Sequence, residues 1–499
     1  MKTKQLTNII KLMYIILCFS IQNFTYAQTQ KGGDIDGETS YDYSGRSVSM
    51  PDANTVAIGA SFNAGDTTEA GHVRVYSWNG LSWVQKGSDI DGEAAYDGSG
   101  WSVSMPDSNT VAIGARNNNG DATEAAGHVR VYSWSGTAWL QKGRDIDGEA
   151  AGDYSGESVS MPDANTVAIG AEVNSGTGTD AGHIRVYSWN GSSWVQKGSD
   201  IDGEAADDRF GGAISMPDSN TVAIGAYGND GTGADAGHVR VFSWSGSTWF
   251  QKGGDIDGEA ASDYSGRSVS MPDANTVAIG AVGNDGTAER AGHVRVYSWN
   301  GSSWVQKGSD IDGEAADDRF GGSVSMPDSN TVAIGAFGND GTGADAGHVR
   351  VYSWNGSSWE QRGSDINGEA ANDYSGGSVS MPDANTVAIG AVGNGGGGKN
   401  AGHVRVYDLF NENTGILENS FGNYLKAFPN PTQGEVKIAL GVNYNDVSVI
   451  VRNSVGKEVM RKSCNNTNLL EICIPGEAGI YCVEVSALDK KALLNLIKE

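Results

Sequence analysis

Short apolar runs recur along the chain from Gln28 onward, and each run is bounded by Gly, Pro, Asn or Asp. In one repeated unit, four runs follow one another: SVSMPD, NTVAIGA, GHVRVYSW and SWVQKG. Val, Ile, Trp and Tyr favour strands, and the Pro-Asp-Ala-Asn and Trp-Asn-Gly-Ser-Ser-Trp segments are typical of tight turns. No run has the apolar period of a helix. The pattern predicts an all-β unit of four strands.

The unit is repeated along most of the chain. The segment AGHVRVY, or a close variant, recurs at intervals of 55 or 56 residues and contains every histidine of the chain: His72, His128, His183, His238, His293, His348 and His403. Four strands per unit, repeated seven times, are typical of a seven-bladed β-propeller, in which each blade packs against two neighbours. An open solenoid is the alternative.

The two ends of the repeated region favour a closed ring. The first copy begins with only QTQKGGDIDGE, and the last copy stops after GHVRVYDLF, without a fourth run. The strand missing from the last copy therefore stands at the start of the region. We expect residues 28–33 to pair with the strand around residues 403–407 and to close seven blades.

Residues 1–27 are typical of an export signal. Three lysines precede an apolar run over residues 12–19, and the segment that ends at Ala27 resembles a cleavage site. The run is shorter than the roughly 20 residues that a membrane-spanning helix needs. We expect cleavage near Ala27, no membrane span in the mature chain, and a secreted or cell-surface, outer-membrane-associated protein.

Charge divides the chain into unlike parts. The formal net charge is −27, and residues 28–415 alone contain 22 basic and 52 acidic residues, a net of −30. We expect no nucleic-acid partner, because the sequence lacks the basic residues that would form a nucleic-acid-binding surface.

The acidic segments are expected on one face of the ring. In a propeller, the connection from one blade to the next lies on the same face as the loop between strands two and three. Here the connection reads DIDGEAADDRFGG in one copy, and the loop reads YGNDGTGADAG in another. These loops also differ most between copies, which fits either partner recognition or relaxed constraint.

Residues 318–336, DRFGGSVSMPDSNTVAIGA, resemble the FG-GAP repeats of integrin α-subunit propellers, and the likeness extends over all seven copies. The resemblance implies a seven-bladed propeller at residues 28–411 that binds an extracellular ligand, with calcium held between strands one and two in some blades. The corresponding segment here, residues 271–275, is too short and has too few oxygen ligands for calcium.

The C-terminal residues differ in character. Runs such as VKIAL, VSVIVRN, KEVMRK, LEICI and IYCVEV predict a small β-sandwich over residues 424–499, after a linker at 412–423. LKAFPNPTQGEVKIAL and AGIYCVEVSALDKKALLNLIKE are similar to the C-terminal sorting domain of type IX secretion cargo, which implies engagement with that secretion machinery. Cys464, Cys473 and Cys482 lie here, so at most one disulfide can form in the mature chain.

The acidic connections contain the metal-ligand candidates. Calcium would be held by carboxylates of two connections: Asp200, Asp202, Glu204 and Asp208, and Asp310, Asp312, Glu314 and Asp318. Their spacing does not follow the calcium loop of an EF-hand. A solvated turn is the other interpretation, and both stay open.

Two further residue types recur in each copy. The histidines could form a ring of metal ligands, but one His per blade spreads them apart, and we expect each His, with the Arg two positions later, to hydrogen-bond between blades. Trp pairs such as Trp189/Trp194 and Trp299/Trp304 could stack on sugars, but they flank a hairpin and are expected to pack as cross-strand pairs.

No catalytic motif stands out, because the sequence has no nucleophile elbow, no His-Glu-x-x-His pair and no phosphate-binding loop. The sequence favours a monomeric, non-enzymatic, adhesion-like propeller that binds an extracellular protein or glycan. A carbohydrate-binding or carbohydrate-cleaving module and a structural surface or matrix protein are the alternatives.

Overall fold

A computed structural model of the chain describes residues 28–65, 67–119, 124–409, 416–419, 421, 425–430, 432–453, 457–488 and 490–498. The expected export signal and much of the expected linker lie outside these residues. The chain divides into two compact units, one over Gln28–Leu409 and one that contains Phe410–Glu499. None of the described segments forms a helix with the length and apolarity that crossing a membrane takes.

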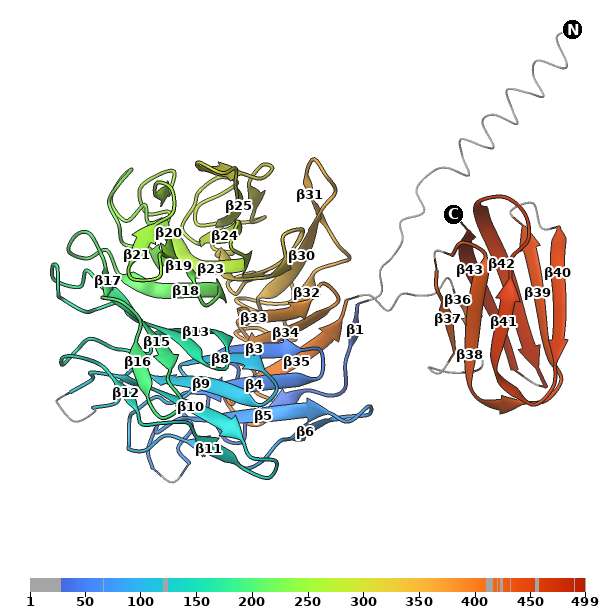
Figure 1. Ribbon diagram of the computed structural model, residues 1–499, viewed down its shortest axis with the longest axis horizontal. Helices are drawn as coiled ribbons and strands as arrows, with labels where there is room; N and C mark the ends of the chain where they lie inside the picture. The colour runs from blue at the N-terminus through green and yellow to red at the C-terminus, as the bar shows by residue number, and fades with distance from the viewer. Residues whose placement is uncertain are drawn as a thin grey trace, which may run out of the picture. The chain divides into compact units, whose positions relative to one another are not determined.

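The first unit consists of repeated antiparallel sheets, the blades, each built from the four runs that the sequence predicts (Figure 1). The SVSMPD run lies in the first strands, β3 (Ser47–Asp52), β8 (Ser102–Asp107), β13 (Ser158–Asp163), β18 (Phe210–Asp218), β23 (Ser265–Asp273), β28 (Phe320–Asp328) and β33 (Ser375–Asp383). The TVAIGA run forms the second strands, β4 (Thr55–Ala60), β9 (Thr110–Ala115), β14 (Thr166–Ala171), β19 (Thr221–Ala226), β24 (Thr276–Ala281), β29 (Thr331–Ala336) and β34 (Thr386–Ala391).

The outer half of each blade begins at the histidine. The third strands are β5 (His72–Trp78), β10 (His128–Trp134), β15 (His183–Trp189), β20 (His238–Trp244), β25 (His293–Trp299), β30 (His348–Trp354) and β35 (His403–Asp408). The fourth strands are β6 (Trp83–Gln85), β11 (Trp139–Gln141), β16 (Trp194–Gln196), β21 (Trp249–Gln251), β26 (Trp304–Gln306) and β31 (Trp359–Gln361).

Each blade also has a short fifth strand that the sequence analysis placed wholly in the connection. Its Ile-Asp pair follows the fourth strand and pairs with the third strand, as in His72↔Asp91 and Val73↔Ile90. The fourth strand covers only the far end of the third, from Tyr76 onward, so the histidine end is left for these strands to pair. They are β7 (Ile90–Asp91), β12 (Ile146–Asp147), β17 (Ile201–Asp202), β22 (Ile256–Asp257), β27 (Ile311–Asp312) and β32 (Ile366–Asn367).

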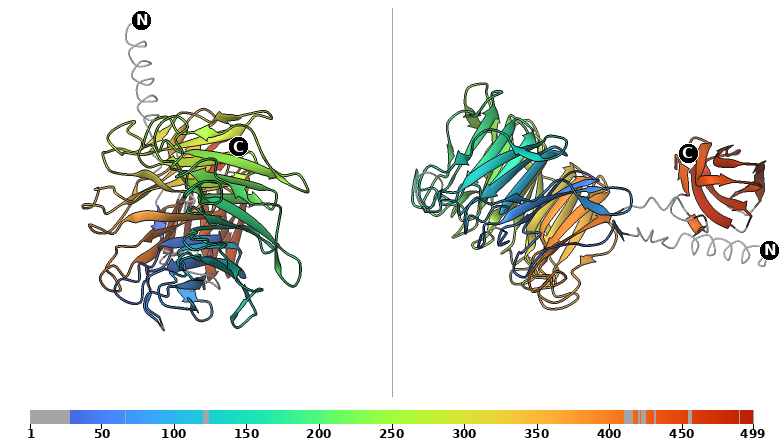
Figure 2. Two further views of the ribbon diagram at one scale, coloured as in Figure 1. Left: turned by 90° about the vertical axis from the view of Figure 1, so that its left-hand side faces the viewer. Right: turned by 90° about the horizontal axis from the view of Figure 1, so that it is seen from below.

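The ring closes as the sequence predicts. β1 (Thr29–Gln30) and β2 (Ile35–Asp36) pair with β35 of the seventh blade, and the Lys31 N–H donates to the Val406 carbonyl at 2.7 Å. The blue strands of the first blade accordingly lie beside the orange strands of the seventh in Figures 1 and 2. The fold of this unit is a seven-bladed β-propeller, and the open solenoid is excluded.

The hydrophobic core lies between blades rather than within them. One cluster joins Val73 and Ile90 of the first blade to Met105 and Ile113 of the second. An equivalent cluster joins the first blade to the seventh, so the closing boundary is as apolar as the others. Each blade therefore depends on two neighbours for burial of its faces.

The second unit is a small β-sandwich. One sheet has the order β36-β43-β42-β39-β40 and the other β37-β38-β41. The strands are β36 (Ile416–Asn419), β37 (Lys426–Phe428), β38 (Glu435–Tyr444), β39 (Val447–Asn453), β40 (Glu458–Cys464), β41 (Thr467–Cys473), β42 (Gly479–Ala487) and β43 (Lys490–Lys498).

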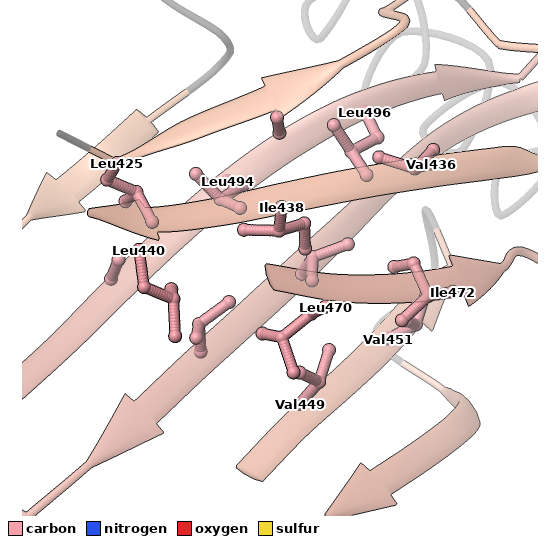
Figure 3. Close-up of a cluster of buried hydrophobic side chains, with 14 of the residues drawn as sticks. Leu425, Val436, Ile438, Leu440, Val449, Val451, Leu470, Ile472, Leu494 and Leu496 are labelled. Carbon is pink, nitrogen blue, oxygen red and sulfur yellow. The ribbon is translucent and has the colours of Figure 1, made fainter. Parts of the chain in front are cut away.

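Figure 3 shows aliphatic side chains of both sheets meeting in the core of this sandwich, among them Ile438, Val449, Leu470 and Leu494. The three cysteines Cys464, Cys473 and Cys482 are all free thiols.

Candidate functional site

The connections between blades and the loops between second and third strands lie side by side on one face, which we call the loop face. Gly92 N–H in the first connection donates to the Gly71 carbonyl at 2.8 Å, and Ser99 N–H donates to the Ala70 carbonyl at 2.9 Å. Equivalent bonds recur at the other blade boundaries. The predicted sharing of one face by both acidic segments is confirmed.

Two of the calcium candidates stabilise the connection itself. Asp208 accepts hydrogen bonds from the backbone N–H groups of Glu204 at 3.0 Å and Ala205 at 2.9 Å, and from Asn229 Nδ2 at 3.1 Å. Asp318 has the equivalent partners. Both carboxylates are buried, and their lone pairs are taken by N–H donors rather than directed at a common point.

The other candidates of each set lie in separate places. Asp200 accepts from Gln196 Nε2 at 2.6 Å and approaches His183 of its own blade, whereas Glu204 lies 3.2 Å from Arg240 of the next blade. Between them, Asp202 is in the short strand β17. That strand extends the chain, so the four carboxylates do not gather as the sequence analysis proposed.

The second set of candidates is divided in the same way. Asp310 accepts from Gln306 Nε2 at 2.6 Å, Asp312 lies in β27, and Glu314 forms an ion pair with Arg350 of the next blade. Burial raises the pKa of Asp312, and the nearby charge of Asp310 adds to that effect.

The predicted bonding of the repeated Arg between blades is confirmed. In the first blade, Arg74 Nη2 donates to the Asp36 carbonyl of β2 at 2.7 Å, and the corresponding Arg of the other blades makes the same contact in all but the sixth. The histidine behaves differently: His72 Nδ1 lies 3.7 Å from Asp89 Oδ2, longer than a hydrogen bond. Burial lowers the pKa of His72 to about 4, Arg74 adds to the effect, and Asp89 opposes it.

Each histidine therefore faces carboxylates rather than standing alone, which the sequence analysis missed. In the first blade, ligand atoms of Glu38, His72 and Asp89 all lie within 4.8 Å of one another. A signal was present in the sequence, since an Asp stands 17 positions after six of the seven histidines. The short strand, which brings that Asp back beside the histidine, was needed to interpret it.

Blade-specific residues occupy two positions at the inner edge of the loop face. The first position follows the strand-one glycine and holds Arg46, Trp101, Glu157, Gly212, Arg267, Gly322 and Gly377. The second follows the TVAIGA strand and holds Ser61, Arg116, Glu172, Tyr227, Val282, Phe337 and Val392. We call these two rings of residues the axial mouth.

The axial mouth brings side chains of distant blades together. Burial lowers the pKa of Arg46, and its charged neighbours include Glu157 of the third blade and Arg267 of the fifth. Only a position near the ring axis places the first, third and fifth blades within mutual influence. The guanidinium carbons of Arg46 and Arg116 each lie 4.0 Å from a ring centroid of Trp101.

A buried acid, Glu172, has the same charged neighbours, Glu157, Arg267 and Arg116, as Arg46. Burial raises the pKa of Glu172 to about 7, and the charge of Glu157 adds to the effect. Burial and the neighbouring Glu172 raise the pKa of Tyr227 to about 12. A side chain at Gly212 would come 2.7 Å from Glu172 Oε2 and 2.9 Å from the Tyr227 ring, so a glycine there makes room for both.

Aromatic side chains lie on the loop face of the first and second blades. Tyr43 and Phe62 have ring centroids 5.3 Å apart, and Phe62 lies 6.5 Å from Trp101. On the same face, Tyr41 is 48% exposed, Phe62 37% and Tyr96 60%. In the other five connections, the position of Tyr41 and Tyr96 holds Gly, Asp, Ser, Asp or Asn. We call Tyr41, Tyr43, Phe62, Tyr96 and Trp101 the aromatic patch.

The Trp pairs are packed as predicted. Trp189 and Trp194 are direct cross-strand partners with ring centroids 5.4 Å apart. Trp194 Nε1 donates to the Lys142 carbonyl of the preceding blade at 2.7 Å, and Lys142 Nζ lies 5.3 Å from a ring centroid of each indole. The pair stabilises a blade boundary, and the indole donor of Trp194 is already used.

Comparison with known proteins identifies the C-terminal unit. Residues 426–499 match the family described as Secretion system C-terminal sorting domain. The chain thus carries a sorting domain of the type IX route, which marks it for secretion. A search of curated proteins found no match.

A search of solved structures found several matches to this chain. The β-propeller domain of the Trilobed protease from Pyrococcus furiosus has 10% identity, with 69% of this chain and 87% of that chain covered and a TM-score of 0.39. A periplasmic gluconolactonase from Pseudomonas aeruginosa has 11% identity, 81% and 95% coverage and a TM-score of 0.40. A protein of unknown function from Dyadobacter fermentans has 11% identity, 76% and 99% coverage and a TM-score of 0.38.

Proposed function

We propose that the protein is a secreted, surface-attached propeller of the FG-GAP type that binds an extracellular protein or glycan through its loop face. The observation that carries this proposal is the aromatic patch. The blades are otherwise close copies, yet Tyr, Phe and Trp meet where the first and second blades adjoin, beside the arginines of the axial mouth. Tyr, Trp and Arg are the side chains that dominate the binding energy of protein interfaces.

Exposure supports the same assignment. Tyr41, Phe62 and Tyr96 expose large apolar rings on a face that is otherwise acidic, and exposed apolar surface of this kind marks interaction sites. The acidic surroundings would favour a ligand of complementary charge and repel acidic ones, which gives specificity more than affinity.

The repetition of the acidic residues favours a binding role over a catalytic one. The acidic residues of the connections recur from blade to blade, whereas an active site needs one distinct constellation of acid, base and nucleophile. The loop face has seven similar acidic connections, and the aromatic patch occupies one part of that face.

The proposal is tested with arrays of extracellular proteins and glycans probed with the mature protein. The expected result is retention on a restricted set of ligands, reduced at least about tenfold by Phe62→Ala combined with Tyr96→Ala. Leu81→Ala is the matched control, because Leu81 is 83% exposed in a hairpin turn away from the loop face. Absence of any retained ligand, or equal loss in the control, would contradict the proposal. Cleavage of an arrayed glycan would favour the carbohydrate-active alternative instead.

A further inference from the structure

One histidine at the closing boundary has a buried nitrogen with no partner. His403 is 1% exposed, and neither of its ring nitrogens has a hydrogen-bond partner. Its Nδ1 atom points at two carboxylates, 3.9 Å from Asp34 Oδ2 and 4.0 Å from Glu369 Oε2. These carboxylates come from two different connections, the one that enters the first blade and the one that enters the seventh.

The two carboxylates are held so that one oxygen of each stays directed at the histidine. Gln30 Nε2 donates to Asp34 Oδ1 at 2.6 Å, and Arg405 Nη1 lies 3.6 Å from Glu369 Oε1. The remaining oxygens, Asp34 Oδ2 and Glu369 Oε2, are those that approach Nδ1. Outer groups that orient carboxylate and imidazole ligands in this way are typical of metal centres.

Asn394 Nδ2 lies 3.4 Å from Glu369 Oε2, at the long limit of a hydrogen bond, so this oxygen is held only weakly. The separations from His403 Nδ1 are too long for hydrogen bonds from the imidazole, and two carboxylates directed at one buried nitrogen repel each other unless a cation lies between them. A modest rotation of the two carboxylates, which are 33% and 46% exposed, would bring their oxygens within coordination distance of a common point.

A related arrangement recurs around the ring, although at the closing boundary Asp36 also has a ligand atom within 4.8 Å of those of Asp34 and His403. In four further blades, ligand atoms of one Glu, one His and one Asp lie within 4.8 Å of one another: Glu38/His72/Asp89, Glu93/His128/Asp145, Glu149/His183/Asp200 and Glu204/His238/Asp255. In each of these clusters a Gln Nε2 donates to Oδ1 of the Asp at 2.6 Å. In the second blade, Glu93 and Asp145 also line a surface groove of about 670 Å³, so that cluster is open to solutes.

The sixth blade differs. There Arg350 donates to both oxygens of Asp365, at 2.9 and 3.3 Å, and also forms an ion pair with Glu314. The guanidinium of Arg350 already lies between the two carboxylates, so we do not expect this cluster to bind a metal ion.

We propose that the His-Asp-Glu clusters on the loop face bind divalent first-row transition-metal ions, with Zn²⁺ as the representative ion. Imidazole nitrogen with two carboxylate oxygens suits Zn²⁺, whereas Ca²⁺ and Mg²⁺ take oxygen ligands almost exclusively. Three protein ligands leave at least one position for water or for a group of a bound partner. These sites differ from the calcium sites considered from the sequence, because each combines residues of two connections with a histidine.

The test uses the full mature chain with Cys464→Ser, Cys473→Ser and Cys482→Ser, because free thiols also bind Zn²⁺. After removal of metal with a chelator, Zn²⁺ or Ca²⁺ is titrated and the bound ions are counted. In the test variant, Gln replaces the seven glutamates of the clusters: Glu38, Glu93, Glu149, Glu204, Glu259, Glu314 and Glu369. In the matched control, Asn replaces seven aspartates of the hairpin turns, so the charge change is equal: Asp52, Asp107, Asp163, Asp218, Asp273, Asp328 and Asp383.

The expected result is about five Zn²⁺ per chain, one for each cluster named above, with little Ca²⁺, loss of most Zn²⁺ in the glutamate variant and no loss in the control. Fewer than one Zn²⁺ per chain, equal binding of Ca²⁺, or equal loss in both variants would overturn the proposal. Should the glutamate variant not fold, anomalous diffraction at the zinc edge from Zn²⁺-soaked crystals of the parent chain decides the matter. Density about 2.0–2.1 Å from His403 Nδ1 supports the proposal, and its absence there contradicts it.

Discussion

Gln30 pairs with Tyr407 in the antiparallel register that Gln85 has with Tyr76 inside the first blade. The boundary between the two ends of the propeller is therefore equivalent to an ordinary pairing within a blade. The equivalence extends to the short strand, because Ile35 pairs with Val404 as Ile90 pairs with Val73.

Substitution at Ile35 tests whether this closure persists in solution. Ile35 and Ile256 are equally buried in equivalent short strands, one at the closing boundary and one inside the ring. Ile35→Ala and Ile256→Ala should each lower the free energy of unfolding by about 2–5 kcal/mol, since each removes a buried side chain from an apolar cluster. Denaturant unfolding measures both. A loss below about 1 kcal/mol for Ile35→Ala alone would mean that the ring is open.

The buried acid of the axial mouth gives a pH-dependent prediction. The pKa of Glu172 is about 7 in the folded protein and 4.5 as its ordinary value, so folding favours the protonated form. The contribution of this group is complete below pH 4.5 and is lost as pH rises through 7. At pH 8, the free energy of unfolding of Glu172→Gln should therefore exceed that of the parent by up to about 3 kcal/mol. At pH 4.5, the two proteins should have nearly the same free energy of unfolding. Thermal or urea unfolding at both pH values measures the difference, and an equal difference at the two pH values would contradict the assignment.

The Trp pairs give a prediction that separates packing from sugar binding. Trp194→Phe keeps a ring at the blade boundary but removes the donor to the Lys142 carbonyl, and should cost about 1–2 kcal/mol of stability. Val195→Ala, at the neighbouring exposed residue, should be nearly neutral. Retention on a glycan array should be unchanged in both variants, and its selective loss in Trp194→Phe would favour a carbohydrate-binding edge.

The sorting domain gives a prediction about export. Removing residues 424–499 should leave the propeller with its melting temperature unchanged within about 2 °C, because the two units have separate cores. The shortened protein should remain inside the outer membrane, since the secretion signal is lost. Fractionation and immunoblotting measure its location, and equal amounts in the medium with and without the domain would refute this role.

Much of the fold could be predicted from the sequence, because the same pattern of strands and turns occurs in seven copies. The run TVAIGA is interpretable only as a strand, and the fourth run that the last copy lacks identifies residues 28–33 as the closing strand. The Ile-Asp strand could not be predicted, because two residues have no periodicity of their own. Its existence depends on the third strand being longer than the fourth.

The site was harder to predict for a related reason. Asp200 and Asp208 look alike in the sequence, yet one faces His183 and the other accepts backbone N–H groups. The spacing of residues along one connection does not show which blade each side chain will face. The aromatic patch was equally hidden, because Tyr43, Phe62 and Trp101 come together only when the first and second blades pack side by side.

The central claim is that a ligand binds the loop face over the aromatic patch, and site-specific photo-crosslinking tests it most directly. A photoreactive amino acid replaces Tyr96 in the patch or, in a matched variant, Leu81 in the opposite hairpin turn. Each variant is irradiated on the ligand that the array retains. Crosslinking from position 96 and none from position 81 is the predicted result. Crosslinking from position 81 alone, or equally from both, would contradict the account.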